Sequence, residues 1–209
     1  MSSDRGSSVE MDDADIRAGG SKPGARGRDR RLGRADWMAA GQALLIEGGV
    51  RALRLAALTA RLKVSSGSFY HHFRDMDEFL GALADDYSSE QIERLIDEIS
   101  RETQDPLDRL RLLARRTWRS ELMRLDGAMR VWAASDLRAA QALKRSESVV
   151  LAFMSEAFRV AGFDEAEATM RARLFTSLQV AHLLSLSDAE SWQMRREAFV
   201  LLTAQPAKR

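Results

Sequence analysis

Small hydroxyl and glycine residues, followed by a tyrosine and two histidines, occupy positions 65–72 in the order SSGSFYHH. Serine hydroxyls and the free N–H groups at a helix start can hold phosphate oxygens, and small side chains let the backbone approach a groove. Tyr70, His71 and His72 add a phenol and two imidazoles, which are hydrogen-bonding groups. The segment therefore predicts a surface that contacts nucleic acid.

Two short predicted helices position these groups. Residues 55–62 carry leucines three and four apart, and residues 66–72 follow after Lys63-Val64-Ser65, with Ser65 as the expected N-cap. This length and spacing match a helix-turn-helix. The expected inner face consists of Leu58, Leu62, Val64, Phe69 and Phe73. Ser66, Gly67, Ser68 and the Tyr70–His72 group then lie on the outer face of a recognition helix.

The sequence gives little support for a metal site or for enzyme activity. Adjacent His71 and His72 lie about 100° apart on a helix, so they make a poor metal pair, and no metal site is expected. Cysteine is absent, which excludes disulfides, thiolate metal sites and cysteine nucleophiles. No nucleotide-phosphate loop, H-E-x-x-H pair or G-x-S-x-G elbow occurs. We expect no enzyme activity and no cofactor, and an enzyme that uses a C-terminal cavity is the least favoured alternative.

The helical pattern extends over nearly the whole chain beyond residue 34. Ala, Leu, Arg and Glu dominate, no stretch alternates with period two, and the prolines lie at 23, 106 and 206. We therefore expect an all-α protein of about nine helices. Their expected ranges are 35–47, 55–62, 66–72, 76–101, 106–125, 127–134, 137–161, 164–185 and 188–204.

Positive charge is concentrated near the N-terminus although the net charge is only +1. Residues 1–16 hold one arginine against five acidic residues (−4), and residues 17–34 hold seven basic residues against Asp29 (+6). Residues 35–73 hold four basic and two acidic residues (+2), so the remaining 136 residues sum to −3. A basic N-terminal region followed by a mildly acidic remainder is typical of a nucleic-acid-binding protein.

The first 33 residues contain six glycines and show no hydrophobic periodicity. We expect a disordered acidic-then-basic tail, which is either a DNA-contacting arm or a solvated segment without a role. No apolar run approaches the roughly 20 residues that span a bilayer. We accordingly expect no membrane partner and a cytoplasmic location.

The segment VSSGSFYHHF at 64–73, followed by RDMDEFL at 74–80, resembles the DNA-binding core of the tetracycline-repressor (TetR) family. That family typically shows V-S-K-G-T-L-Y-Y-H-F and then K-x-K-E-E-L, after a helix that ends near two glycines. The resemblance covers about residues 35–80. It implies a homodimeric transcription factor, usually a repressor, that a small molecule releases from an operator with two half-sites.

The resemblance also implies roles for single residues. Ser66, Gly67 and His71 fall where the family contacts base edges, and Ser68, Tyr70 and His72 fall where it holds phosphates. The sequence departs from the family pattern at four positions. Ser66 replaces a lysine, His71 replaces a tyrosine, Met76 replaces a lysine whose phosphate contact Arg74 could supply, and Leu53 replaces a threonine cap. Arg54 beside it is either a phosphate contact or a solvated surface side chain, and Tyr70 could instead be half-buried packing.

The resemblance implies a DNA-binding domain at 34–80 and a ligand-binding and dimerisation domain at 81–205. Dimerisation is expected through helices 164–185 and 188–204, by a stripe of Leu174, Leu178, Ala181 and Ser185 completed by Trp192, Phe199, Val200 and Thr203. Large soft side chains could line an apolar effector cavity with Arg130 as a charged anchor, although ordinary core packing is the alternative for each. These residues are Trp118, Met123, Met129, Arg130, Trp132, Phe153, Met154 and Phe175.

Alternatives remain open for the helix-turn-helix and for His182. The helix-turn-helix could serve non-specific DNA binding or protein contacts only. His182 stands alone on a predicted apolar helix, where a core or interface histidine is favoured over a ligand contact.

Overall fold

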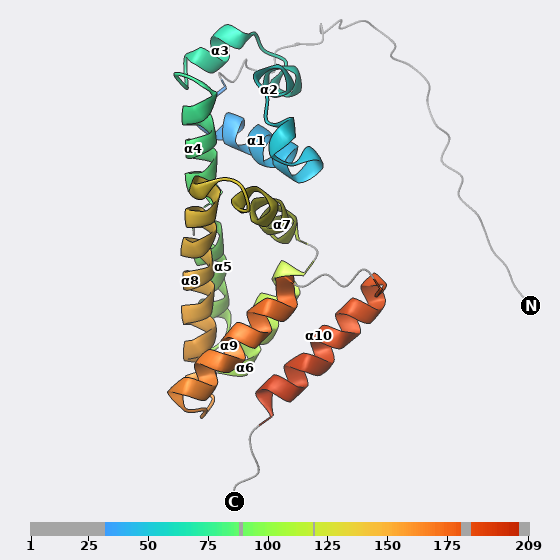
Figure 1. Ribbon diagram of the computed structural model, residues 1–209. Coiled ribbons are helices and arrows are strands. Elements are labelled where there is room, and N and C mark those ends of the chain that lie inside the picture. The colour runs from blue at the N-terminus through green and yellow to red at the C-terminus, as the bar shows by residue number, and fades with distance from the viewer. Residues whose placement is uncertain (1–31, 88–89, 119, 181–184, 205–209) are drawn as a thin grey trace, which may run out of the picture. The chain divides into compact units, whose positions relative to one another are not determined.

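The computed structural model describes residues 32–87, 90–118, 120–180 and 185–204. These ranges contain ten α-helices and one 3₁₀ helix (Figure 1). The elements are α1 (Arg34–Gly48), η1 (Val50–Ala52), α2 (Leu55–Leu62), α3 (Ser66–Tyr70), α4 (Met76–Tyr87), α5 (Glu90–Glu102), α6 (Pro106–Thr117), α7 (Glu121–Ala133), α8 (Leu137–Val160), α9 (Glu165–Val180) and α10 (Asp188–Thr203). The predicted tail and His182 lie outside the described residues, except for Leu32 and Gly33.

The all-α prediction is confirmed, and the differences concern helix boundaries. The predicted helix 76–101 corresponds to α4 and α5. The predicted boundary near residue 126 was wrong, because α6 ends at Thr117 and α7 begins at Glu121. Ser120 explains this start, since its hydroxyl accepts a hydrogen bond from the Met123 N–H at 3.2 Å and caps α7. Asp136 caps α8, accepting a hydrogen bond from the Arg138 N–H at 2.9 Å.

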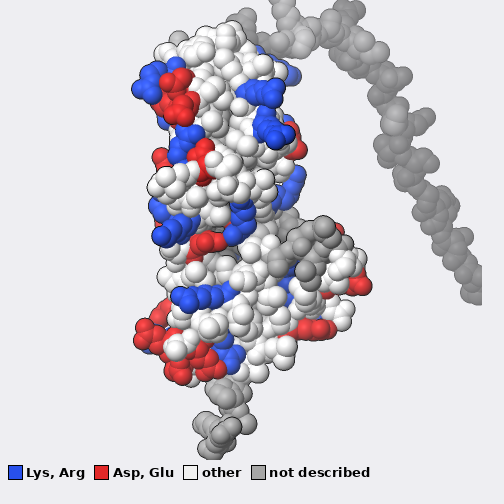
Figure 2. Space-filling model, in the orientation of Figure 1, with Lys and Arg blue, Asp and Glu red and all other residues white. Residues whose placement is uncertain are grey.

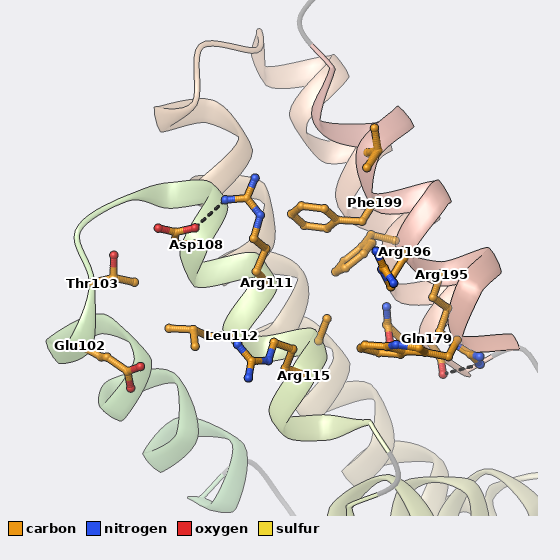
Figure 3. Close-up of a pocket in the computed structure, with 14 residues that line it drawn as sticks. Glu102, Thr103, Asp108, Arg111, Leu112, Arg115, Gln179, Arg195, Arg196 and Phe199 are labelled. Atoms are coloured by element: carbon orange, nitrogen blue, oxygen red, sulfur yellow. Dashed lines mark hydrogen bonds and ion pairs between the residues drawn. The ribbon is translucent and has the colours of Figure 1, made fainter. Parts of the chain in front are cut away.

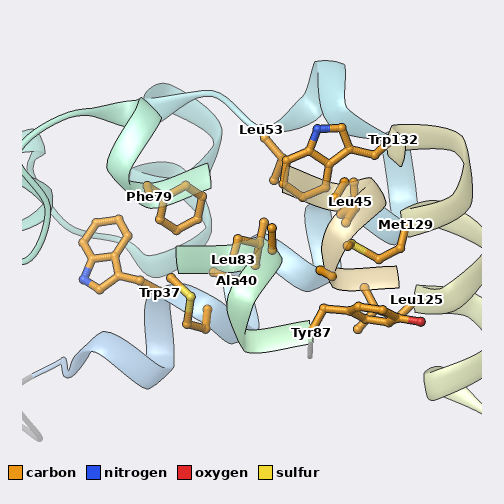
Figure 4. Packing of buried hydrophobic residues seen from close by; sticks show 14 of the residues in the cluster. Trp37, Ala40, Leu45, Leu53, Phe79, Leu83, Tyr87, Leu125, Met129 and Trp132 are labelled. Atoms are coloured by element: carbon orange, nitrogen blue, oxygen red, sulfur yellow. The ribbon is translucent and has the colours of Figure 1, made fainter. Parts of the chain in front are cut away.

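The N-terminal core joins the first four helices to α7 and to the start of α8 (Figure 4). Trp37 of α1, Phe69 of α3 and Phe79 of α4 are completely buried, and the Trp37 and Phe69 rings meet edge to face at 5.4 Å between centroids. Met129 and Trp132 of α7 are buried in the same cluster. The packing of the predicted DNA-binding segment therefore continues into the second half of the chain, beyond the expected domain boundary at residue 80.

A second core lies among α5, α6, α9 and the C-terminal half of α8. Ile99, Leu110, Phe158 and Phe175 are almost completely buried there. Phe199 of α10 joins this core from its edge, with its ring centroid 5.6 Å from that of Phe175. None of the helices in the described ranges has an apolar stretch long enough to cross a bilayer.

Arginine 195 fastens α10 to the end of α9. It is only 7% exposed, and its guanidinium donates to the carbonyl oxygens of Leu178 at 3.0 Å and Ser191 at 3.2 Å. The same group lies 4.3 Å from the centroid of the Trp118 ring. Because the last carbonyls of a helix have no partner within it, this arginine satisfies part of the α9 C-terminus while holding α10 in place.

Candidate nucleic-acid interface and cavities

The turn between α2 and α3 is tight and left-handed. Lys63 has φ 57° and ψ 44°, and the Val64 N–H donates to the Thr59 carbonyl at 3.1 Å. The backbone then becomes extended at Ser65, which stands at the N-cap of α3 but forms no side-chain cap bond. Val64 and Leu62 pack against the N-terminal core as the sequence predicted. The turn thus presents the start of α3 to solvent.

The outer face of α3 is polar and open. Ser65, Ser66, Gly67 and His71 are exposed, and Ser68 and His72 are half-buried. Tyr70 is 58% exposed, so packing does not account for its side chain. Phe69 and Phe73 point into the core at 0% and 1% exposure. Inner and outer residues are thus arranged as a recognition helix requires.

Both flanking arginines make contacts within the protein. Arg54 is exposed, and its Nε donates to the Arg51 carbonyl at 3.1 Å. Arg74 pairs with Asp75, with 3.0 Å between Nε and Oδ2. The hydrogen bond and charge of Asp75 raise the pKa of Arg74 above its usual value. Arg74 must therefore share its charge with a carboxylate if it replaces the missing lysine as a phosphate contact.

Arg34 positions α3, and the sequence alone gave no sign of this role. Its Nη1 donates to the His72 carbonyl at 3.2 Å, and its guanidinium lies 4.5 Å from the centroid of the Phe73 ring. It also faces Glu78 of α4 at 3.7 Å. Arg34 therefore links the start of α1 to the end of α3, where the basic N-terminal segment enters the domain.

Replacement of Arg34 by methionine should loosen the end of α3. Methionine keeps an apolar stem but loses the bond to the His72 carbonyl, a loss of about 1 kcal/mol for a partly exposed group. We expect roughly fivefold faster hydrogen exchange at the His71 and Phe73 amides, measured by NMR. Arg159→Met, which removes a surface ion pair on α8, should leave this exchange unchanged. Equal exchange in both variants would contradict the positioning role.

A family model described as bacterial regulatory proteins, tetR family, matches residues 38–83. That range contains most of α1, the α2–turn–α3 unit and the first two turns of α4. The N-terminal segment of the chain therefore matches the TetR family. The polar face of α3 lies within the matched range.

Solved structures share the fold of this chain. The Escherichia coli NemR reduced form is 19% identical, with a TM-score of 0.68, covering 84% of this chain and 99% of that one. A TetR-family transcriptional regulator from Agrobacterium tumefaciens is 14% identical, with a TM-score of 0.67 and coverage of 82% and 97%. A putative TetR-family regulator from a Rhodococcus species is 18% identical, with a TM-score of 0.61 and coverage of 82% and 98%. A search of curated proteins gives no match.

Charge is unevenly spread over the surface of the molecule. In the view of Figure 2, the top, where α2 and α3 lie, is mostly uncharged, with basic side chains on both sides of it and an acidic group at the left. Acidic side chains also gather at the opposite end, around the turn between α8 and α9.

An open groove of about 570 Å³ lies between α6 and α10 (Figure 3). Arg111 of α6 and Phe199 of α10 face each other across it, with 5.3 Å between the guanidinium carbon and the ring centroid. Phe175, one of the predicted cavity residues, lies at its floor. The groove lining includes no residue of α4 or α7, so it has no direct contact with the helices that join the N-terminal core.

A smaller inner cavity of about 70 Å³ lies where α4 to α9 meet. Three of the predicted cavity residues, Met123, Arg130 and Met154, line it. An adjoining space of about 260 Å³ shares Met123 and Arg130 and adds Trp118, which the sequence also proposed. The inner cavity contacts α4 and α7, and the adjoining space, which we call its mouth, contacts α7 but not α4. The groove contacts neither helix.

Three of the proposed cavity residues are placed elsewhere. Met129 and Trp132 are 0% and 1% exposed in the N-terminal core and line none of the cavities described above. Phe153 packs against the second core. The helical period explains the division on α7, since Leu125, Met129 and Trp132 share one face and Leu122, Met123, Asp126 and Arg130 line the cavity from another.

Four polar side chains from three helices are bonded together beside the inner cavity. The Tyr87 hydroxyl donates to Asp126 Oδ1 at 2.7 Å, and Arg130 Nε donates to Asp126 Oδ2 at 2.6 Å. Arg130 Nη1 donates to Glu147 Oε1 at 2.7 Å. We call these four residues the tyrosine–carboxylate cluster. Arg130 was the predicted anchor for an anion, yet it is already paired with two carboxylates.

The cluster fixes the protonation states of Tyr87 and Arg130. Burial, followed by the charge of Asp126, raises the pKa of the Tyr87 hydroxyl far above its usual value. Burial alone would lower the pKa of Arg130, but hydrogen bonds and charges from Asp126 and Glu147 outweigh it and raise that pKa. Tyr87 therefore remains a neutral donor and Arg130 remains a cation.

Proposed function

We propose that this TetR-family regulator acts as a homodimeric repressor that a small amphipathic ligand releases from its operator. The observation that carries the DNA-binding part is the α2–turn–α3 unit, whose inner aromatic residues are buried and whose outer face is polar and exposed. Ser66, Gly67 and His71 are proposed to contact base edges, and Ser68, Tyr70 and His72 to hold phosphates. A regulator that binds chromosomal DNA works in the cytoplasm, where we place it.

Dimerisation is proposed through α9 and α10. Large apolar side chains are exposed on both helices, namely Met170 and Leu174 on α9 and Val200 and Leu201 on α10. Apolar side chains exposed together favour burial against a partner. Trp192 and Phe199, which the sequence assigned to this interface, pack instead within the chain against Trp118 and Phe175. A two-fold dimer would place two α3 helices on half-sites about 34–36 Å apart.

The effector is assigned to the inner cavity and its mouth rather than to the larger α6–α10 groove. The inner cavity is lined by Tyr87, the last residue of α4, and by Asp126 and Arg130 of α7. Both helices pack in the N-terminal core with α1 and α3. A ligand that favours one arrangement of these helices shifts the population between DNA-binding and released states.

The test is binding of the full-length protein to DNA from immediately upstream of its own gene, followed by selection from random DNA. We expect a dimer to bind one sequence at about 150 mM salt at least about 10³-fold more tightly than scrambled DNA. Tyr70→Ala should weaken that binding about tenfold or more by removing a phosphate contact. Val131→Ala is the control, because Val131 is 72% exposed on α7.

Two outcomes would contradict the proposal. Binding with the same salt dependence for every sequence would indicate non-specific DNA association. Equal affinities of Tyr70→Ala and Val131→Ala would show that the polar face of α3 does not contact the operator.

A further inference from the structure

The lining of the inner cavity carries an excess negative charge. Of its residues only Asp126, Arg130 and Glu147 are charged, so two carboxylates and one guanidinium sum to −1. Tyr87 does not change this sum, because it remains a neutral donor. A cavity with one uncompensated negative charge favours a cation, since charges in a partly buried site are poorly screened by water.

The bonding within the cluster opposes an anion. Arg130 directs Nε and Nη2 to Asp126, at 2.6 Å and 3.4 Å, and Nη1 to Glu147. A ligand carboxylate approaching this guanidinium would meet both of these carboxylates. By contrast, Glu147 accepts the Arg130 hydrogen bond through Oε1, and its side chain is 38% exposed. Glu147 can therefore accept a hydrogen bond from a further donor.

The remainder of the lining is chiefly apolar. Seven aliphatic or thioether side chains from five helices line it, namely Ile92, Leu113, Leu122, Met123, Val150, Met154 and Val180. Four uncharged polar residues complete the lining, namely Thr117, Ser146, Thr176 and Gln179. Methionine side chains adapt to ligands of different shape. The mouth of about 260 Å³ next to the cavity shares Asp126 and Arg130 with it and adds Arg124, Asp188 and Arg195, so the negative excess belongs to the inner cavity alone. A ligand headgroup at the carboxylates can extend an apolar part into this mouth.

We propose that the effector of this regulator is a hydrophobic organic cation, an alkyl- or arylalkylammonium, that binds between Asp126 and Glu147 and competes with Tyr87 for Asp126. This inference rests on the proposed function, because it specifies the ligand class and the coupling residue of the same site. An ammonium group has three N–H donors, so it can bind two carboxylates at once.

The competition at Asp126 connects the ligand to the DNA-binding helices. Tyr87 ends α4, which begins at Met76, three residues after the buried Phe73. Asp126 belongs to α7, which holds Met129 and Trp132 of a neighbouring face in the N-terminal core. A ligand ammonium that takes the Asp126 oxygen from the Tyr87 hydroxyl removes a direct link between α4 and α7. The two helices then change their packing against α1 and α3.

The first test measures ligand binding without DNA. The full-length protein is titrated at pH 7 with phenethylammonium, phenylacetate and 2-phenylethanol, which share a phenyl ring and differ in charge, and binding is followed by calorimetry and ligand-observed NMR. We expect the ammonium to bind at least about tenfold more tightly than the other two, as expected for one charged hydrogen bond. Glu147→Gln should remove this preference.

Glu156→Gln is the matched control, because Glu156 also lies on α8 and also pairs with an arginine, Arg159, at 2.6 Å, but on the surface. It should bind phenethylammonium like the unaltered protein. Circular dichroism checks that both variants are folded. Tighter binding of phenylacetate, equal binding of all three probes, no binding of the ammonium, or equal effects of the two glutamine substitutions would each overturn the ligand assignment.

The second test separates coupling from binding with Tyr87→Phe, which removes only the hydroxyl. We expect this variant to bind phenethylammonium as tightly as the unaltered protein or more tightly, while the probe no longer reduces its operator affinity. Release of DNA at the same probe occupancy as in the unaltered protein would overturn the coupling role of Tyr87. If the chain binds no specific DNA, the proposed function fails, but the titrations without DNA still decide the ligand class.

Discussion

Replacement of Phe69 by alanine is expected to lower the free energy of unfolding of the N-terminal core by about 3–5 kcal/mol. Phe69 is completely buried, and its ring lies 5.4 Å from Trp37, 5.3 Å from Phe73 and 5.8 Å from Phe79, between centroids. Removing the ring leaves a cavity at the centre of these contacts. Urea denaturation, followed by circular dichroism and tryptophan fluorescence, measures the loss.

Tyr70→Ala is the matched control for this substitution. Tyr70 is the next residue of α3, also aromatic, but it is 58% exposed. Its replacement should change the free energy of unfolding by no more than about 0.5 kcal/mol while weakening operator binding. Similar destabilisation by both substitutions would mean that the inner and outer faces of α3 are assigned wrongly.

Replacement of Gly41 by alanine is expected to destabilise the protein by about 1–3 kcal/mol, although alanine normally favours a helix over glycine. Gly41 lies inside α1, where a Cβ atom would come within 2.7 Å of Phe79 Cζ and 3.1 Å of Leu83 Cδ1. Phe79 and Leu83 are almost completely buried and cannot swing into solvent. The absence of a side chain at Gly41 thus sets the distance between α1 and α4.

Gly81→Ala provides the opposite expectation on α4. No atom lies within 4 Å of a Cβ placed there, so helix propensity acts alone and should stabilise the protein by up to about 1 kcal/mol. Thermal denaturation of the two variants should therefore give shifts of opposite sign. Shifts of the same sign would contradict the close approach of α1 and α4.

The helix-turn-helix could be predicted from the sequence because its pattern is local. Leu58, Val64, Phe69 and Phe73 occur within sixteen residues, and spacing alone places them on one face. The boundary between α6 and α7 was harder to predict from the sequence. Trp118 and Ser120 interrupt a run of residues that otherwise suits one helix, and only the Ser120 cap marks the new start.

The inner cavity could be predicted only in part. Asp126 and Arg130 stand four residues apart, a spacing that indicates an ion pair on one helix face. Their partners Tyr87 and Glu147 come from other helices, so the packing of α4 and α8 against α7 determines the cluster. The same packing turns Met129 and Trp132 away from the cavity, which composition could not reveal. The positioning role of Arg34 could not be predicted, because its acceptor is a backbone carbonyl 38 residues away in the sequence.

Two exposed ion pairs between α4 and α8 make the packing of these helices sensitive to salt. Asp77 pairs with Arg138 at 2.7 Å and Asp85 pairs with Arg145 at 2.9 Å, and both aspartates are exposed. Ions that screen phosphates also screen these links between α4 and α8. The slope of operator affinity against salt concentration therefore combines counterions released from DNA with a loosening of the protein. A count of phosphate contacts from that slope alone would be too high.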